Sequence, residues 1–346
     1  MAVGLVYHPV YLEHDTGHHP ERASRLVEIK AALERDGLWP RLHHLSPRPA
    51  TEPELLEAHS QEHIRWVKSQ AQQGGGWVDM DTILSAGSYQ AALYAAGGAI
   101  VAAEAVLKGD VSQALALVRP PGHHATRDQA MGFCLINNMA VAIHALLAGG
   151  TAQRIFIFDF DAHHGNGTEA AFYSDPRVFF FSMHQHPLYP GTGHADHMGD
   201  GEGRGTTINV PLPPECGDEE FRQVCGLMAQ AVRRFRPDII LVSAGYDGHW
   251  LDGISQLQLS VSGYAQTAET IRGVAGEVCG GKAVFLLEGG YHAAALSTSV
   301  VATCRVLLGE EWVDLLGPPM PYSPPDISPL LHGLRHIHEL DEAEGS

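Results

Sequence analysis

Short apolar runs, separated by longer helical patterns, place the strongest constraint on how this chain can fold. The clearest run, residues 155–158, has no Gly or Pro beside it and is typical of a strand buried on both faces of a parallel sheet. Similar runs predict strands at residues 3–7, 114–118, 179–183, 239–242 and 283–287. Because helical patterns lie between these runs, we expect a single α/β, doubly wound domain with a mainly parallel central sheet and helices on both faces.

The helical patterns reveal neither a linker nor an internal repeat. Thr51 and Glu54 form a capping box that opens a short helix, and Gly97 and Gly98 inside an Ala-rich pattern indicate close packing. Further helices are expected at residues 21–36, 88–107, 137–147, 218–236 with Asp218 as N-cap, 262–278 and 292–308. We expect one domain over residues 1–316 and a tail over residues 317–346, Pro-rich and then acidic, wrapped on the surface or partly disordered.

The charge balance limits the partners that this chain can take. Net charge is −18, from 22 basic and 40 acidic residues, so the surface repels nucleic acid phosphate and anionic membranes and attracts cationic groups. Five widely spaced Cys residues without a C-x-x-C pair fit a reducing compartment. Residues 1–11 lack the features of a signal peptide, and no uninterrupted apolar run approaches membrane-spanning length. We expect a cytoplasmic protein without nucleic-acid or membrane partners; the sequence carries no signal of an oligomeric state.

Polar clusters follow at least four of the predicted strands. In open α/β sheets, sites lie beyond the carboxyl ends of the strands, so these clusters should converge on one crevice. They are His123 and His124, the run 159–164, Asp247, and Tyr291.

The run 159–164 contains the spacing of a metal site. Asp161 and His163 are two residues apart, so in an extended segment they project to the same side, together with Asp159. A divalent cation would offset the cost of burying them, and an oxygen plus a nitrogen ligand suits zinc. Asp247 is the third proposed ligand, although a single Asp before a Gly is more often a turn residue. Three ligands leave one position open, which is typical of a catalytic ion, and we expect one Zn²⁺ per chain.

Two adjacent histidines are candidates for acid–base chemistry. His123 and His124 follow a rigid Pro-Pro-Gly element; they could also be a surface pair or metal ligands. Asp159 or Asn166 could each accept a ring N–H, and a carboxylate partner would raise the pKa of its histidine more than an amide would. Tyr291 could donate its phenol to a developing oxyanion, or pack as an aromatic lid.

Six ordered motifs, spread over most of the chain, resemble the histone deacetylase family. Asn166 and the fifth motif are similar to its class II branch and to bacterial deacetylase-like amidohydrolases, and H-P-E-R (19–22) fits as well. The resemblance extends from residue 1 to about 308. The motifs are R-P-P-G-H-H-A (119–125), G-F-C-L-I-N-N (132–138), F-D-F-D-A-H-H-G-N-G-T (158–168), Y-P-G-T-G (189–193), S-A-G-Y-D (243–247) and L-E-G-G-Y (287–291).

The resemblance implies a zinc-dependent deacetylase with defined roles at the site. Asp161, His163 and Asp247 would hold zinc, His124 would be the general base, and Tyr291 would donate to the oxyanion. His123 would be the electrostatic partner, paired with Asp159. A monovalent cation, K⁺ in the family, would lie among Asp159, Asp161, His163, Ser182 and Met183.

The resemblance also implies a tunnel for an acylated amine at the end of an aliphatic chain. Acetyl-lysine is the favoured substrate and an acetylpolyamine or another small acylated amine the alternative. Ile254 stands where a polyamine-selective relative carries a Glu, which weakens the polyamine assignment. Phe160 and Ala162 depart from the usual class II residues, a difference that we attribute to packing. The tunnel would be lined by Gly132, Phe133, Tyr189 and Ile254, with Asp81 at its rim.

Two other classes of protein fit parts of the pattern. A binuclear manganese ureohydrolase needs D-x-H-x-D at the strand end, but residue 165 is Gly here and cannot supply a side-chain ligand; His249 could be an extra donor. A non-catalytic reader of acylated ligands would keep the pocket without turnover, which the presence of His124, Asp247 and Tyr291 disfavours.

Overall fold

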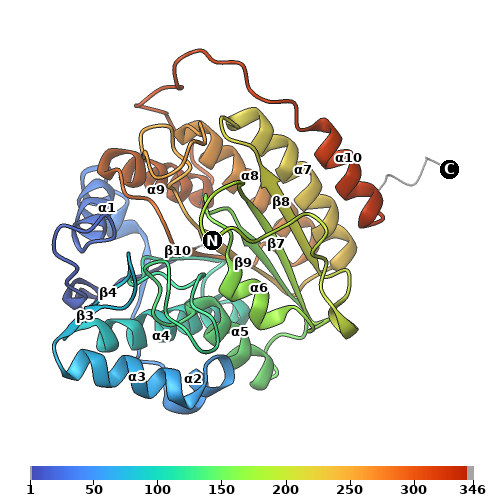
Figure 1. Cartoon of the computed structure of the whole chain (residues 1–346). Helices are drawn as coiled ribbons and strands as arrows, with labels where there is room; N and C mark the ends of the chain where they lie inside the picture. Colours follow the sequence, from blue (N-terminus) through green and yellow to red (C-terminus); the bar gives the residue numbers. More distant parts are fainter. Residues whose placement is uncertain (1, 341–346) are drawn as a thin grey trace.

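The predicted apolar runs form the centre of an eight-stranded sheet in the computed structural model, which describes residues 2–340. The strand order is β2-β1-β5-β10-β9-β6-β7-β8, and every neighbouring pair is parallel. The predicted fold class is therefore confirmed (Figure 1). The strands are β1 (Val3–Val6), β2 (His43–Leu45), β5 (Gln113–Ala116), β6 (Ile155–Asp159), β7 (Val178–Gln185), β8 (Thr207–Leu212), β9 (Ile239–Ala244) and β10 (Ala283–Leu287).

The sequence patterns missed the two edge strands and a small hairpin. β2 is short and begins with two exposed histidines, and β8 contains Pro211, so neither looks like a buried run. Pro is tolerated at a sheet edge because one side of that strand needs no N–H donor. The antiparallel hairpin of β3 (Gly75–Trp77) and β4 (Ile83–Ser85) begins in a Gly-rich stretch, which has no strand pattern.

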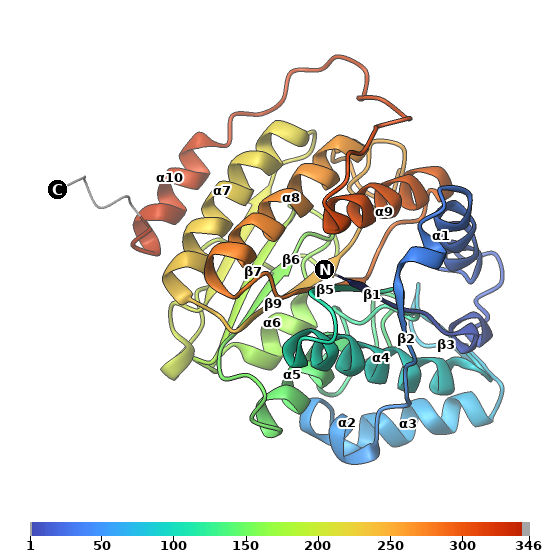
Figure 2. The ribbon, with the colours of Figure 1, turned by 180° about the vertical axis from the view of Figure 1, so that it is seen from behind.

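Helices cover both faces of the sheet (Figures 1 and 2). One layer contains α1 (Ser24–Arg35), α7 (Asp218–Phe235), α8 (Val261–Val278) and α9 (Ala293–Leu308), with α10 (Ser328–Ile337) packed beside α7. The other contains α2 (Glu52–Ala58), α3 (Gln61–Gln72), α4 (Ser88–Lys108), α5 (Asn138–Ala148) and α6 (Asn166–Phe172). Short 3₁₀ helices are Pro9–Glu13, Trp39–Arg41 and Gly201–Gly203.

The sequence has no uninterrupted apolar run of membrane-spanning length, yet helix α4 is long and apolar enough to cross a membrane by length and composition. In this fold 67% of its apolar window is buried, and it packs against β1, β5 and α5. Its apolar character is thus accounted for by its place in the core.

Two helix starts differ from the predictions because a side chain has a tertiary partner. Helix α1 begins at Ser24 rather than near Glu21, whose buried carboxylate pairs with Arg25 and Arg119. Helix α7 has Gly217 as its N-cap, and the Asp218 carboxylate instead accepts hydrogen bonds from the N–H and hydroxyl of Ser260.

The expected surface tail contains a helix that the sequence analysis missed. Leu331 and Leu334 of α10 are buried, and α10 contacts α7 and β8. The acidic end of the predicted tail, residues 341–346, lies outside the described residues.

The close packing of α4 gives a prediction about stability. A Cβ at Gly97 would lie 1.9 Å from the Arg48 carbonyl oxygen, whereas a Cβ at Gly273 in α8 has no neighbour within 4 Å. Overpacking costs about 1–3 kcal/mol, more than the roughly 1 kcal/mol that Ala gains over Gly in a helix. We expect Gly97→Ala to lower the thermal midpoint and Gly273→Ala to maintain or raise it. Thermal unfolding followed by circular dichroism measures both, and a wild-type midpoint for Gly97→Ala would contradict the packing described.

Candidate active site

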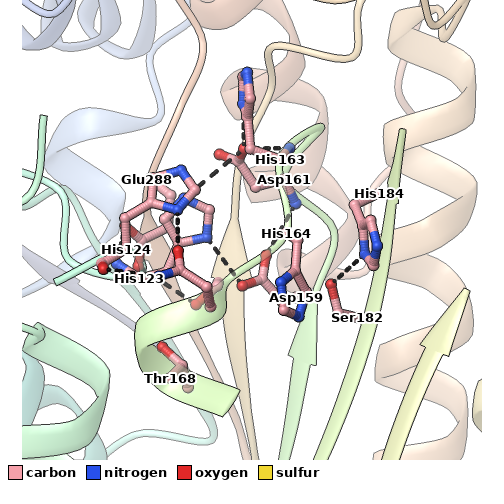
Figure 3. Close-up of polar contacts among 12 residues, drawn as sticks. His123, His124, Asp159, Asp161, His163, His164, Thr168, Ser182, His184 and Glu288 are labelled. Atoms are coloured by element: carbon pink, nitrogen blue, oxygen red, sulfur yellow. Dashed lines mark hydrogen bonds and ion pairs between the residues drawn. The ribbon is translucent and has the colours of Figure 1, made fainter. Parts of the chain in front are cut away.

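The polar clusters that follow β5, β6, β9 and β10 lie together at the carboxyl edge of the sheet. Figure 3 shows His123 and His124 facing the turn after β6, with Glu288 beside them. β6 pairs with β9, and β9 with β10, so residues far apart in sequence arrive at neighbouring strand ends. The convergence expected from the sequence is therefore present.

Three buried donors surround one point in this crevice. An oxygen of Asp161, a nitrogen of His163 and an oxygen of Asp247 all lie within 4.8 Å of one another. His163 Nδ1 is 3.1 Å from Asp161 Oδ1 and 3.0 Å from Asp247 Oδ2. A single N–H can point at only one of these oxygens, whereas a cation between the three atoms satisfies all of them.

The turn after β6 differs from the extended segment that we expected. β6 ends at Asp159, and the chain then bends: Asp159 Oδ1 accepts from the N–H of Asp161 (3.1 Å), and Asp161 Oδ1 accepts from the N–H of His163 (2.9 Å). Such Asx turns are a common alternative to strand pairing. Asp161 and His163 still face the same point, but Asp159 is directed to His123.

Backbone donors fix the remaining oxygens of the two aspartates. Gly289 N–H donates to Asp161 Oδ2 (2.8 Å), and Ala162 N–H donates to Asp247 Oδ1 (3.0 Å). A Cβ at Gly289 would lie 2.4 Å from Asp247 Oδ2 and 2.6 Å from Asp161 Oδ2, so only glycine fits there. The two-oxygen, one-nitrogen donor set and its enclosed position fit a zinc ion.

The two adjacent histidines have different partners. His123 Nδ1 is 3.0 Å from Asp159 Oδ2, and His124 Nδ1 is 2.8 Å from Asn166 Oδ1 (Figure 3 shows both rings). These oxygen acceptors place a proton on Nδ1 of each ring and leave Nε2 of His124 available as a base. The ring centroids are 4.0 Å apart.

The different partners separate the pKa values of the two rings. Burial lowers the pKa of His123, but the Asp159 and Asp161 carboxylates outweigh burial and raise it to about 10. Burial and the neighbouring His123 and His163 hold the pKa of His124 well below its ordinary value. His124 is therefore neutral at pH 7 while His123 is charged.

Tyr291 lies at the end of β10 beside the same crevice. Its backbone N–H and that of His292 donate to Asp252 Oδ2, at 2.6 and 2.8 Å. The Arg25 guanidinium is 4.9 Å from its ring centroid. Burial and nearby Asp247 raise the pKa of Tyr291 well above the ordinary value, so its phenol stays protonated and can donate.

Aromatic residues form part of an entrance to the crevice. The Tyr189 ring is 5.1 Å from the ring of His124, and the Phe133 ring is 5.7 Å from that of Tyr291. Residue 132 next to them must be glycine, because a Cβ at Gly132 would lie 2.4 Å from His124 Cδ2.

The other proposed entrance residues are less directly placed. Asp81 is half-buried in the β3–β4 loop, and Thr82 Oγ1 of this loop accepts from the N–H of Phe133 (3.1 Å), which joins the loop to the entrance. Ile254 is half-buried in the segment after Asp252.

The residues of the proposed monovalent-cation site are buried at the β6–β7 pair. Asp159 is opposite Ser182 in the parallel register. Ser182 Oγ is 2.9 Å from His184 Nδ1, and Figure 3 shows these two side chains in contact. Met183 is fully buried next to them. Residues 159–163 and 182–183 are therefore adjacent.

Sequence reasoning assigned no role to Glu288, which lies under the histidine turn. Its Oε2 accepts from the N–H groups of Gly122 (2.7 Å) and His123 (3.2 Å), and its Oε1 accepts from Ser243 Oγ (3.3 Å). Burial raises its pKa to about 7. In the sequence, an acidic side chain directly after an apolar strand could have indicated that Glu288 belongs to the site.

A buried ion-pair network behind Tyr291 was also missed. Glu21 pairs with Arg25 and Arg119, and Arg25 donates to the carbonyl oxygens of Gly290 and Glu288, both at 2.6 Å. The H-P-E-R motif drew attention to Glu21, but no local spacing connects it to residues 119 or 290.

Further donors do not extend the proposed metal site within the part of the chain that is described. His249 is outside the group, and its Nδ1 accepts from the N–H of Leu251 (3.1 Å). His123, Cys134 and Glu288 form a second group of three, but His123 and Glu288 are already hydrogen-bonded within the protein. Burial also raises the pKa of the Cys134 thiol well above its ordinary value, which disfavours a thiolate ligand.

Comparisons with known proteins agree with this geometry. Residues 19–307 match the family model described as "Histone deacetylase domain". A "Probable deacetylase" of Archaeoglobus fulgidus is 43% identical over 84% of this chain and 82% of that protein. A "Histone deacetylase-like amidohydrolase" of Pseudomonas aeruginosa is 37% identical over 84% of this chain and 77% of that protein. The crystal structure of the HDA15 HD domain superposes with a TM-score of 0.89 at 34% identity, covering 98% of this chain and 96% of that one.

The contrast between the two histidines can be measured directly. Asn166→Asp places a carboxylate against His124 and should raise its pKa, whereas Asp159→Asn should lower that of His123. An NMR titration of the imidazole resonances of each variant checks both directions. An unchanged pKa of His124 in Asn166→Asp would show that its partner does not set its protonation.

Proposed function

This chain belongs to the histone deacetylase family of deacetylases and amidohydrolases, and we propose that it is a zinc-dependent enzyme that removes an acetyl group from an amine at the end of an aliphatic chain, most favourably acetyl-lysine. The observation that carries the proposal is the meeting of three donors, Asp161, His163 and Asp247, next to a histidine that stays neutral and a tyrosine that stays protonated.

Asp161, His163 and Asp247 would hold the zinc ion. When bound, zinc polarises an amide carbonyl and lowers the pKa of a water molecule from about 15.7 to near 7. The two aspartates keep their ligand oxygens in place through hydrogen bonds from Gly289 and Ala162.

His124 acts as the general base. Its neutral Nε2 accepts the proton of the attacking water, while Nδ1–H is held by Asn166 Oδ1. Such proton transfer contributes about 10²–10⁴-fold to a rate. The charged His123, held by Asp159, stabilises negative charge in the crevice, and a protonated histidine then supplies the proton to the leaving amine.

Tyr291 donates its phenol to the oxyanion of the tetrahedral intermediate. Asp252 holds the backbone of its turn and Arg25 lies over its ring, so the hydroxyl needs little reorganisation during the reaction.

The entrance residues favour a long aliphatic chain that carries the amide. Phe133 and Tyr189 supply aromatic walls, and Ile254 supplies an apolar side chain where an acid would favour a second ammonium group. Asp81 at the rim would accept a hydrogen bond from the substrate backbone. We also assign a K⁺ ion to the buried residues around Asp159 and Ser182, to which Asp161, His163 and Met183 would contribute backbone oxygens.

Tyr291 offers a direct test of the mechanism. Tyr291→Phe keeps the ring but removes the donor, so kcat on an acetyl-lysine peptide should fall about 10²–10³-fold, since one oxyanion donor contributes about 3–4 kcal/mol. KM should change little because the ring still packs on Phe133. Tyr322→Phe, at an exposed position, is the matched control and should keep wild-type kinetics. Full activity in Tyr291→Phe would remove Tyr291 from the mechanism.

Substrate class and metal dependence can be tested in one comparison. We expect kcat/KM for an acetyl-lysine peptide to exceed the values for acetylspermidine and acetylputrescine by roughly a hundredfold, about 2.7 kcal/mol in transition-state binding. A strong chelator should abolish turnover, and one equivalent of Zn²⁺ should restore it. The opposite substrate order would favour a polyamine deacetylase, and restoration only by two Mn²⁺ ions per chain would contradict the zinc proposal.

A further inference from the structure

Three histidines lie side by side on the surface loop that connects β7 to β8. The ring centroids of His186 and His194 are 5.3 Å apart, and those of His194 and His197 are 5.4 Å apart. His194 is exposed, while His186 and His197 are half-buried. These three residues are outside the crevice described above and have no role in the proposed reaction.

The spacing of the two neighbouring ring pairs suits imidazoles that share a metal ion. Two imidazoles that bind one tetrahedral zinc through bonds of about 2.0–2.1 Å have ring centroids roughly 5 Å apart. Imidazole nitrogen is a favoured ligand of Zn²⁺, Ni²⁺ and Cu²⁺. The donor nitrogens of the three rings do not all lie within 4.8 Å of one another, so side-chain rotations have to direct one nitrogen of each toward a common point.

His197 has a buried carboxylate near its ring, at an ion-pair distance that is longer than a hydrogen bond. Its Nδ1 is 3.6 Å from Oε1 of Glu169, a buried residue of α6. A shift of a few tenths of an ångström would let Nδ1–H donate to this carboxylate and direct Nε2 to a metal. Glu169 is itself fixed by hydrogen bonds with His164 Nε2 and Asn209 Nδ2.

Buried side chains hold the backbone of the loop that carries the three histidines. His164 Nδ1 is 2.8 Å from Thr192 Oγ1, and His184 Nε2 is 3.0 Å from the carbonyl oxygen of Gly193. On the other side, His186 N–H donates to the Leu212 carbonyl (2.7 Å). The backbone positions that carry the rings are therefore set before any ion binds, which lowers the entropic cost of binding.

We propose that His186, His194 and His197 form a second metal site, a surface site for a divalent transition-metal ion such as Zn²⁺ or Ni²⁺. The inference goes beyond the proposed function and does not depend on it. The net charge of −18 favours cation binding in general, and the imidazoles select a transition metal over Mg²⁺ or Ca²⁺.

A bound ion would connect the two ends of the segment that carries Tyr189. Residue 186 precedes Tyr189 and residues 194 and 197 follow it, so a shared ion closes a loop around the residue whose ring is 5.1 Å from that of His124. Metal on the surface site therefore restricts motion of one wall of the entrance, and we expect it to change KM more than kcat.

The test counts ions bound by the untagged, chelator-treated chain. In equilibrium dialysis against Ni²⁺, followed by metal analysis, wild type should bind one ion more per chain than His194→Gln. His332→Gln, another exposed histidine, is the matched control and should bind as wild type does. At low Ni²⁺ concentration His186→Gln should lose at least tenfold in affinity, since even indirect ligand partners contribute about 10–100-fold.

The outcomes separate this site from the proposed catalytic ion. Asp161→Asn should lose the crevice ion and keep the surface ion. The surface site is supported when adding His194→Gln, to wild type or to Asp161→Asn, removes one bound ion per chain. Equal ion counts in wild type and His194→Gln would overturn the inference. Circular dichroism of His194→Gln should match wild type, because the substituted side chain is exposed.

Discussion

Burial of several carboxylates at one edge of the sheet is the constraint on which the rest of this structure depends. Asp159, Asp161, Asp247 and Glu288 are each at most 1% exposed. Ionised groups in such surroundings are costly unless charge and hydrogen bonds compensate them. The surrounding loops supply that compensation: the bent turn after β6, the Pro-Pro-Gly turn and the glycines after β10 all direct N–H groups at these oxygens. Histidines provide the remaining donors, and the proposed zinc ion would complete the set.

The parts of the molecule that follow from local patterns could be predicted from the sequence. Central strands such as β6 and β10 are unbroken apolar runs, and a parallel sheet buries both of their faces. The rule that sites lie beyond strand carboxyl ends predicts that Asp247 and Tyr291 lie near Asp161. The motif resemblance supplied individual roles, which spacing alone left open between acid–base chemistry, metal binding and simple packing.

The parts that depend on distant partners could not be predicted in this way. Glu288 supports His123 from 165 residues away, and nothing in the local pattern of either residue indicates the other. Helix α1 begins at Ser24 and not near Glu21, because the Glu21 carboxylate forms a buried ion pair with Arg119. Edge strand β8 and helix α10 were missed because Pro211 and a Pro-rich approach look like loop, although the tertiary packing of Leu331 and Leu334 stabilises the helix.

Arg25 connects the beginning of the chain to the turn that carries Tyr291. Its guanidinium holds the Gly290 carbonyl across 265 residues of sequence, and the same side chain covers the tyrosine ring. During synthesis, the residues that complete this turn leave the ribosome long after the arginine that supports it. A chain that ends before residue 290 lacks this partner of Arg25, so the crevice can assemble only when both halves of the polypeptide fold together.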